Sequence, residues 1–107
     1  MNTNAYIGLG ANLGIPKETF ERALGLLSAY AEIISVSRLY RSEPYGFADQ
    51  PTFVNAAARI STDLPALELL KQLKLAEQNL GKKIIRENGP RIIDLDLLLY
   101  DDLALET

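Results

Sequence analysis

Asp94 and Asp96, near the C-terminal end of the chain, are the residues with the clearest capacity for chemistry. They belong to a segment, 91–100, whose composition is typical of a β-strand. Because successive side chains of a strand point to opposite faces, the two aspartates are expected on the same face. The residues expected on the opposite, core-facing side are Ile93, Leu95, Leu97 and Leu99.

Two carboxylates one strand repeat apart repel each other unless a positive charge lies between them. A divalent cation is the natural partner, and magnesium commonly binds one or two carboxylates together with substrate phosphates. Arg91 precedes the pair and is a candidate phosphate clamp. Aspartate is also disfavoured within strands, which favours a functional pair. The alternative is that both aspartates simply solvate the outer face of the strand.

Four positive charges occur just before the aspartates, at Lys82, Lys83, Arg86 and Arg91. In a chain of net charge −3, this local excess is suited to binding a triphosphate. The alternative is a solvated loop whose lysines interact favourably with the C-terminal end of a helix dipole.

The chain contains neither cysteine nor histidine. Thiolate catalysis and cysteine-ligated zinc are therefore excluded, and the commonest general base is absent. Carboxylate, lysine, arginine, tyrosine and backbone groups remain, a set that suits hard cations such as magnesium. The net charge of −3 argues against a nucleic-acid partner. No signal peptide and no run of ~18 apolar residues is visible, so no membrane partner and a cytoplasmic location are expected.

Phe53 and Asn55 lie two residues apart in an expected strand, 52–61, and therefore on one face. An aromatic side chain beside an amide suits a flat heterocycle, because it offers stacking together with a donor and an acceptor. The alternatives are core packing for Phe53 and strand-end hydrogen bonding for Asn55.

The glycine-rich segment 8–14 does not predict a dinucleotide site, because its spacing differs from G-x-G-x-x-G. No P-loop sequence is present either. The glycines instead allow another backbone or a ligand to approach closely, and Asn12 is interpreted as a turn residue. Taken alone, Glu77 is a surface glutamate of a helix, and Tyr40 and Tyr45 are packing residues.

The hydrophobic patterns predict an α+β fold with the element order β-α-β-β-α-β. The expected strands are 5–11, 32–40, 52–61 and 91–100. One expected helix covers about 16–30. The other begins at Asp63 and Pro65, which resemble an N-cap region and first turn, and Gly81 can end it in a left-handed conformation. This order is typical of a ferredoxin-like fold, a four-stranded antiparallel sheet with two helices on one face. We expect one domain over residues 1–107.

Three segments of the chain resemble one enzyme family. They are the strand and turn at 6–14, the loop and strand at 40–57, and Gly-Pro-Arg-Ile-Ile-Asp-Leu-Asp-Leu-Leu at 89–98. The family is 6-hydroxymethyl-7,8-dihydropterin pyrophosphokinase, which acts in folate biosynthesis. The last segment, in company with the other two, is a specific signature.

The resemblance implies transfer of diphosphate from ATP to the hydroxymethyl group of the pterin, with release of AMP. It implies two magnesium ions held by Asp94 and Asp96, with Arg91 as a phosphate-contacting, catalytic residue. The implied pterin-binding residues are Ser42, Pro44, Tyr45, Phe53 and Asn55. The implied ATP-binding residues are Glu77, Lys82, Arg86 and Arg91.

The resemblance also implies that the chain lacks the family's C-terminal segment, which supplies a further nucleotide contact and an aromatic plate for the pterin. Two other functions stay open. One is a non-catalytic module that binds pterin or nucleotide, and the other is a structural ferredoxin-like interaction domain. The expected partners are small molecules, ATP and the pterin.

Overall fold

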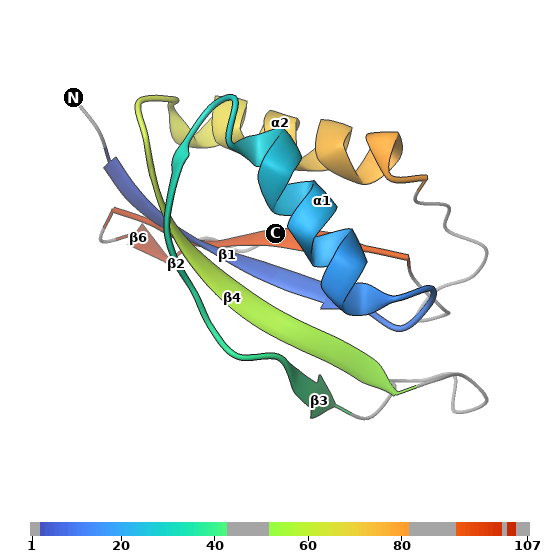
Figure 1. Ribbon diagram of the computed structural model, residues 1–107. Coiled ribbons are helices and arrows are strands. Elements are labelled where there is room, and N and C mark those ends of the chain that lie inside the picture. The colour runs from blue at the N-terminus through green and yellow to red at the C-terminus, as the bar shows by residue number, and fades with distance from the viewer. Residues whose placement is uncertain (1–2, 43–51, 82–91, 102, 105–107) are drawn as a thin grey trace.

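A computed structural model describes residues 3–42, 52–81, 92–101 and 103–104 (Figure 1). The elements are β1 (Thr3–Ala11), α1 (Pro16–Leu27), β2 (Glu32–Val36), β3 (Tyr40–Ser42), β4 (Phe53–Thr62), α2 (Ala66–Asn79), β5 (Asp94–Tyr100) and β6 (Leu103–Ala104). None of the described helices has the length and apolar character needed to cross a membrane.

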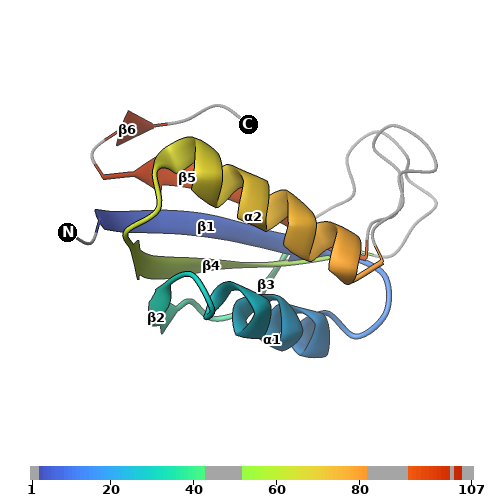
Figure 2. The ribbon, with the colours of Figure 1, turned by 90° about the horizontal axis from the view of Figure 1, so that it is seen from above.

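The strands form one sheet in the order β2-β4-β1-β5-β6, with β3 paired to β4 beyond β2. The pairings of β4 with β1 and β2, and of β5 with β1, are all antiparallel. Both helices cover the same face of the sheet, as the view from above shows (Figure 2). The predicted ferredoxin-like α+β fold is therefore confirmed, although the described sheet has six strands where four were predicted.

One of the additional strands arises because the predicted strand 32–40 is divided into β2 and β3. Ser37 lies at the division, where its backbone N–H donates to Ala57 O at 2.7 Å and its Oγ accepts the Ala57 N–H at 2.8 Å. The Ser37 hydroxyl thus takes the place of a backbone carbonyl as the acceptor for Ala57. Pairing with β4 resumes at Tyr40 with its register shifted by one residue. The other additional strand is β6, which pairs with the end of β5.

The hydrophobic core lies between the sheet and the two helices. Alternate residues of β1 are buried there, and α1 and α2 each contribute residues at helical spacing. The fully buried large side chains of the core are Ile7, Leu27, Ile60, Leu69, Leu73, Ile93, Leu95 and Leu97. Neither helix covers the other face of the sheet, and Tyr6 of β1 is exposed there.

The helix ends differ in part from the prediction. Gly81 ends α2 with a φ of +87°, as the sequence predicted. Asp63 does not cap this helix: the N-cap is Pro65, without a side-chain hydrogen bond. Instead, the hydroxyl of Thr62 accepts the N–H of Leu64 and holds the turn before the helix. The helix α1 ends at Leu27 rather than near residue 30.

The alternation predicted along the last strand fails at its C-terminal end. Leu97 pairs with Ile7, but the next pair joins Leu99 to Tyr6, so Leu98 is an extra residue in a β-bulge. The bulge reverses which residues face the core. Leu99 is therefore 36% exposed. Tyr100 packs against the core in its place and donates its hydroxyl to Leu64 O at 2.6 Å.

Candidate functional site

Asp94 and Asp96 lie on the face of β5 that points away from the helices. Leu95 and Leu97, which alternate with them, are buried in the core, whereas Asp94 is half-buried and Asp96 is exposed. This confirms the predicted arrangement of the two aspartates on one face. It also places both carboxylates on a surface that neither α1 nor α2 covers.

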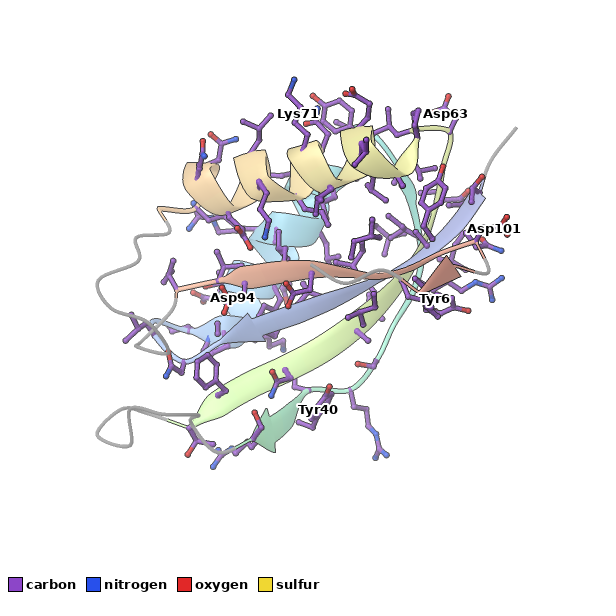
Figure 3. The ribbon with its side chains drawn as sticks, turned by 180° about the vertical axis from the view of Figure 1, so that it is seen from behind. Tyr6, Tyr40, Asp63, Lys71, Asp94 and Asp101 are labelled. Carbon is purple, nitrogen blue, oxygen red and sulfur yellow. The ribbon has the colours of Figure 1, made fainter. Side chains whose placement is uncertain are left out.

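Strand pairing joins the predicted site residues into a row across the sheet. Tyr40 pairs with Asn55, Asn55 with Gly10, and Gly10 with Asp94. Neighbouring strands are about 4.8 Å apart, so Asn55 and Asp94 flank the glycine at a separation of roughly 10 Å. Figure 3 shows Asp94 and Tyr40 on either side of the two middle strands.

A second row runs parallel to the first, two residues along each strand. In it, Ala57 pairs with Gly8 and Gly8 with Asp96. The two rows place small residues in the middle of the face and put both carboxylates at one side. The arrangement leaves room for a flat molecule lying on β1 with its edges toward Asn55 and toward the aspartates.

A cavity of about 290 Å³ occupies this face. Its lining residues come from β1, β3, β4 and β5 and are Gly8, Leu9, Gly10, Tyr40, Phe53, Asn55, Ala56, Ala57, Asp94, Asp96 and Leu98. Four predicted site residues therefore share one cavity. A hollow of similar size between the helices is lined by apolar residues, Tyr30 and two amide side chains, and it has no carboxylate that could hold a metal ion.

The floor of the cavity depends on Gly10. A Cβ atom added there would lie 3.2 Å from Asn55 Oδ1, tighter than an ordinary van der Waals contact. A Cβ atom at Gly8 would meet only the end of the Leu98 side chain, at 3.4 Å. The close approach at Gly10 means that a side chain at this position would displace the Asn55 amide.

Asn55 is held in place by Ser42, because its Nδ2 donates to Ser42 Oγ at 2.7 Å. Ser42 lies on β3, where it pairs with Phe53. Ser42, Phe53 and Asn55 are thus neighbours, as the resemblance implied, although Ser42 does not line the cavity. The other two predicted pterin-binding residues, Pro44 and Tyr45, lie outside the described residues.

Tyr40 contributes to the cavity, contrary to the prediction from its residue type. We interpreted it as a packing residue, but its side chain is 57% exposed and lines the cavity. Its place in the cavity follows from its pairing with Asn55, and this pairing depends on the irregular register after Ser37. The predicted ATP-binding residues Lys82, Arg86 and Arg91 lie outside the described residues.

Glu77 is buried, not a surface residue as its type alone suggested. Its side chain is 4% exposed within α2. Glu77 Oε2 accepts the backbone N–H of Leu95 at 2.6 Å, and Oε1 lies 3.6 Å from Lys74 Nζ. The sequence did contain a signal, because Glu77 interrupts the apolar stripe of α2 one turn after Leu73. Glu77 does not line the cavity, so its nucleotide contact stays a prediction.

The family of the chain follows from comparisons with known proteins. The sequence model of 7,8-dihydro-6-hydroxymethylpterin-pyrophosphokinase matches residues 6–106. A 2-amino-4-hydroxy-6-hydroxymethyldihydropteridine pyrophosphokinase from Haemophilus influenzae is 43% identical over 104 residues, which are 95% of this chain and 65% of that protein. The enzyme of the same name from Pseudomonas aeruginosa is 40% identical, over 99% of this chain and 67% of that protein.

The chain thus spans about two thirds of the length of these curated relatives. Among solved structures, a crystal structure of an unknown protein from Galdieria sulphuraria superposes with a TM-score of 0.55 at 17% identity. It covers 90% of this chain and 48% of that protein, and it supports the fold alone. The match of the family model over nearly the whole chain shows that this protein belongs to the 7,8-dihydro-6-hydroxymethylpterin-pyrophosphokinase family.

Proposed function

We propose that the chain carries the catalytic core of an enzyme that transfers diphosphate from ATP to 6-hydroxymethyl-7,8-dihydropterin. Family membership supports the reaction class. The observation that carries the proposal is the row Asn55–Gly10–Asp94, because it joins an amide suited to a heterocycle and a carboxylate suited to a metal across one glycine floor.

At one end of the cavity, Asn55 binds the pterin edge. Its carboxamide offers both a donor and an acceptor, and the bond from Nδ2 to Ser42 Oγ fixes the plane in which it presents them. Phe53 lies beside it and packs against the ring. Pro44 and Tyr45 complete the pterin pocket in this proposal. The glycine floor lets the ring lie against the backbone of β1.

At the other end, Asp94 and Asp96 would hold the two magnesium ions that accompany ATP. The donor set fits, since both groups supply oxygen ligands for a hard cation. Among the described residues, these two carboxylates would be the protein's contribution to the ions, since magnesium is commonly bound by one or two carboxylates together with substrate phosphates. When bound, magnesium supplies neutralisation of the charge that develops on the triphosphate.

The protein's own contribution to the transfer is orientation. The pterin hydroxymethyl oxygen forms a bond to the β-phosphorus of ATP while the bond from this phosphorus to the α,β-bridging oxygen breaks. AMP leaves, and the hydroxyl proton is released. Such a transfer depends on in-line positioning and charge stabilisation more than on a reactive side chain. Arg91, Lys82 and Arg86 provide further positive charge to the triphosphate in this proposal, with the reaction taking place in the cytoplasm.

The test is AMP release from magnesium-ATP and the pterin alcohol by Asp96→Asn and by the parent protein. Loss of a metal-binding carboxylate lowers turnover by about a hundredfold or more, because charge stabilisation is a large part of such catalysis. The matched control is Asp101→Asn. Asp101 follows β5, outside the cavity, and its φ of +58° is one that asparagine tolerates.

Equal AMP release by Asp96→Asn and the control would count against the proposal. A second candidate function is pterin binding without turnover, because none of the described residues that line the cavity carries a positive charge for a triphosphate. This second function predicts that the folded parent protein binds the pterin in a calorimetric titration but forms no AMP. The same pair of measurements therefore separates the two functions.

A further inference from the structure

We infer that Glu77 is a positioning residue, which fixes the orientation of Asp94 and Asp96 by binding the backbone between them. The inference rests on the proposed function, since it concerns the metal-binding end of the same site. It assigns to Glu77 a role distinct from contact with the nucleotide.

The bond that carries the inference joins the last turns of α2 to the middle of the metal-binding segment. Glu77 Oε2 accepts the N–H of Leu95 at 2.6 Å, and this contact is buried. Leu95 is the residue between the two aspartates. Lys74 Nζ lies 3.6 Å from the other carboxylate oxygen of Glu77 and partly balances its charge. A buried acceptor of this kind forms a strong hydrogen bond and holds its donor firmly.

Strand pairing explains why this N–H needs a side chain. Leu95 lies opposite Leu9 of β1, yet its N–H reaches α2, so this N–H points away from β1. In the described part of the chain, β6 pairs only with Leu99 and Tyr100, beyond the bulge at Leu98. The segment with the aspartates therefore forms the edge of the described sheet, and Glu77 supplies the acceptor that a further strand would supply.

The geometry transmits the effect of this bond to the opposite face. Asp94 and Asp96 flank Leu95 and project from the other side of the sheet. A rotation of the Leu95 peptide would turn both carboxylates relative to Gly8 and Gly10, their partners on β1. The bulge at Leu98 separates the segment with the two aspartates from the end of β5 that pairs with β6. Glu77 thus acts from behind the sheet, without lining the cavity.

The experiment compares Glu77→Leu and Glu77→Gln with a matched control, Gln78→Leu, on the exposed side of the same helix. The first readout is hydrogen exchange at the Leu95 amide, with the Ile7 amide of β1 as an internal reference. We expect Leu95 to exchange about tenfold faster in Glu77→Leu, because its buried donor loses its partner, while Ile7 changes little. Glu77→Gln, which keeps a weaker acceptor, should give a smaller increase confined to Leu95.

The second readout is Mn²⁺ affinity with α,β-methylene-ATP, measured by electron paramagnetic resonance. We expect about a tenfold loss in Glu77→Leu, within the range seen when groups that orient metal ligands are removed, and none in Gln78→Leu. If Glu77→Leu does not fold, Glu77→Gln carries the test through its selective effect on Leu95 and a smaller loss of Mn²⁺ affinity.

Different failures of this experiment have different meanings. If Leu95 and Ile7 exchange faster by the same factor, Glu77 serves only global stability and the inference is wrong. If Mn²⁺ affinity is unchanged in the Glu77 variants but falls in Asp96→Asn, the proposed function stands and the inference is again wrong. If Asp96→Asn also leaves Mn²⁺ affinity unchanged, the proposed function fails and the positioning role fails with it. Weaker binding of metal-free AMP with unchanged Leu95 exchange would instead indicate a direct nucleotide contact.

Discussion

At the scale of single residues, the site depends on side chains that are absent as much as on those present. Gly8 and Gly10 leave the centre of the sheet face open, and Asn55 occupies part of the space that they leave. The sequence indicated a close approach at these glycines. It did not identify Asn55 as the neighbour, because that contact follows from the register of β1 on β4.

Gly10→Ala is expected to weaken pterin binding by about tenfold, equivalent to roughly 1.4 kcal/mol. The new Cβ would lie 3.2 Å from Asn55 Oδ1, and the bond to Ser42 limits how far the amide can retreat. Calorimetric titration with the pterin alcohol checks this prediction. The control is Gly25→Ala on α1, where a Cβ meets nothing within 4 Å. It should leave binding unchanged and raise the free energy of unfolding by about 0.5–1 kcal/mol.

Tighter or equal pterin binding by Gly10→Ala would contradict the assignment of this cavity to the pterin.

At the scale of elements, the sequence predicted which segments form helices and strands, and it failed where pairing becomes irregular. Hydrophobic periodicity was sufficient for β1, α1, α2 and β4, because their buried residues follow one regular spacing. The division at Ser37 and the bulge at Leu98 depend on a partner strand, which local sequence does not specify. Within the site, the prediction that the two aspartates share a face is correct, because the bulge at Leu98 lies beyond them along β5.

Ser37→Ala is expected to lower the free energy of unfolding by about 1 kcal/mol, because the Ala57 N–H loses the hydroxyl that accepts it. Urea denaturation measures this loss. Ser35→Ala, two residues earlier on β2 and also exposed, serves as the control and should change stability by less than about 0.5 kcal/mol. Equal effects of the two substitutions would show that the Ser37 hydroxyl does not stabilise the junction of β2 and β3.

At the scale of the whole molecule, one core supports a site on the far side of the sheet. Both helices pack on one face of the sheet and the cavity lies on the other. The side chains that stabilise the core are therefore mostly different from those that line the cavity. The sequence predicted this division in part, because Asp94 and Asp96 alternate with Ile93, Leu95 and Leu97. Glu77 is the exception, since it belongs to the core by burial and to the site by its bond to Leu95.

Leu73→Ala is expected to destabilise the protein by about 2–5 kcal/mol, because it leaves a cavity where a fully buried side chain of α2 packs against the core. Leu67→Ala, on the same helix but 80% exposed, should change the free energy of unfolding by less than about 0.5 kcal/mol. Urea denaturation of both variants provides the comparison. Similar losses would mean that the helix face assigned to the core is wrong.

The central position of β1 has a consequence for synthesis of the chain. This strand is made before both of its partners, β4 on one side and β5, the later of the two, on the other. While the chain grows, β1 keeps an unpaired edge that can join a strand of another molecule. Closing that edge is also the step that brings the aspartates opposite Gly8 and Gly10. Protection from aggregation and competence to bind substrate are therefore acquired together, when β5 takes its place.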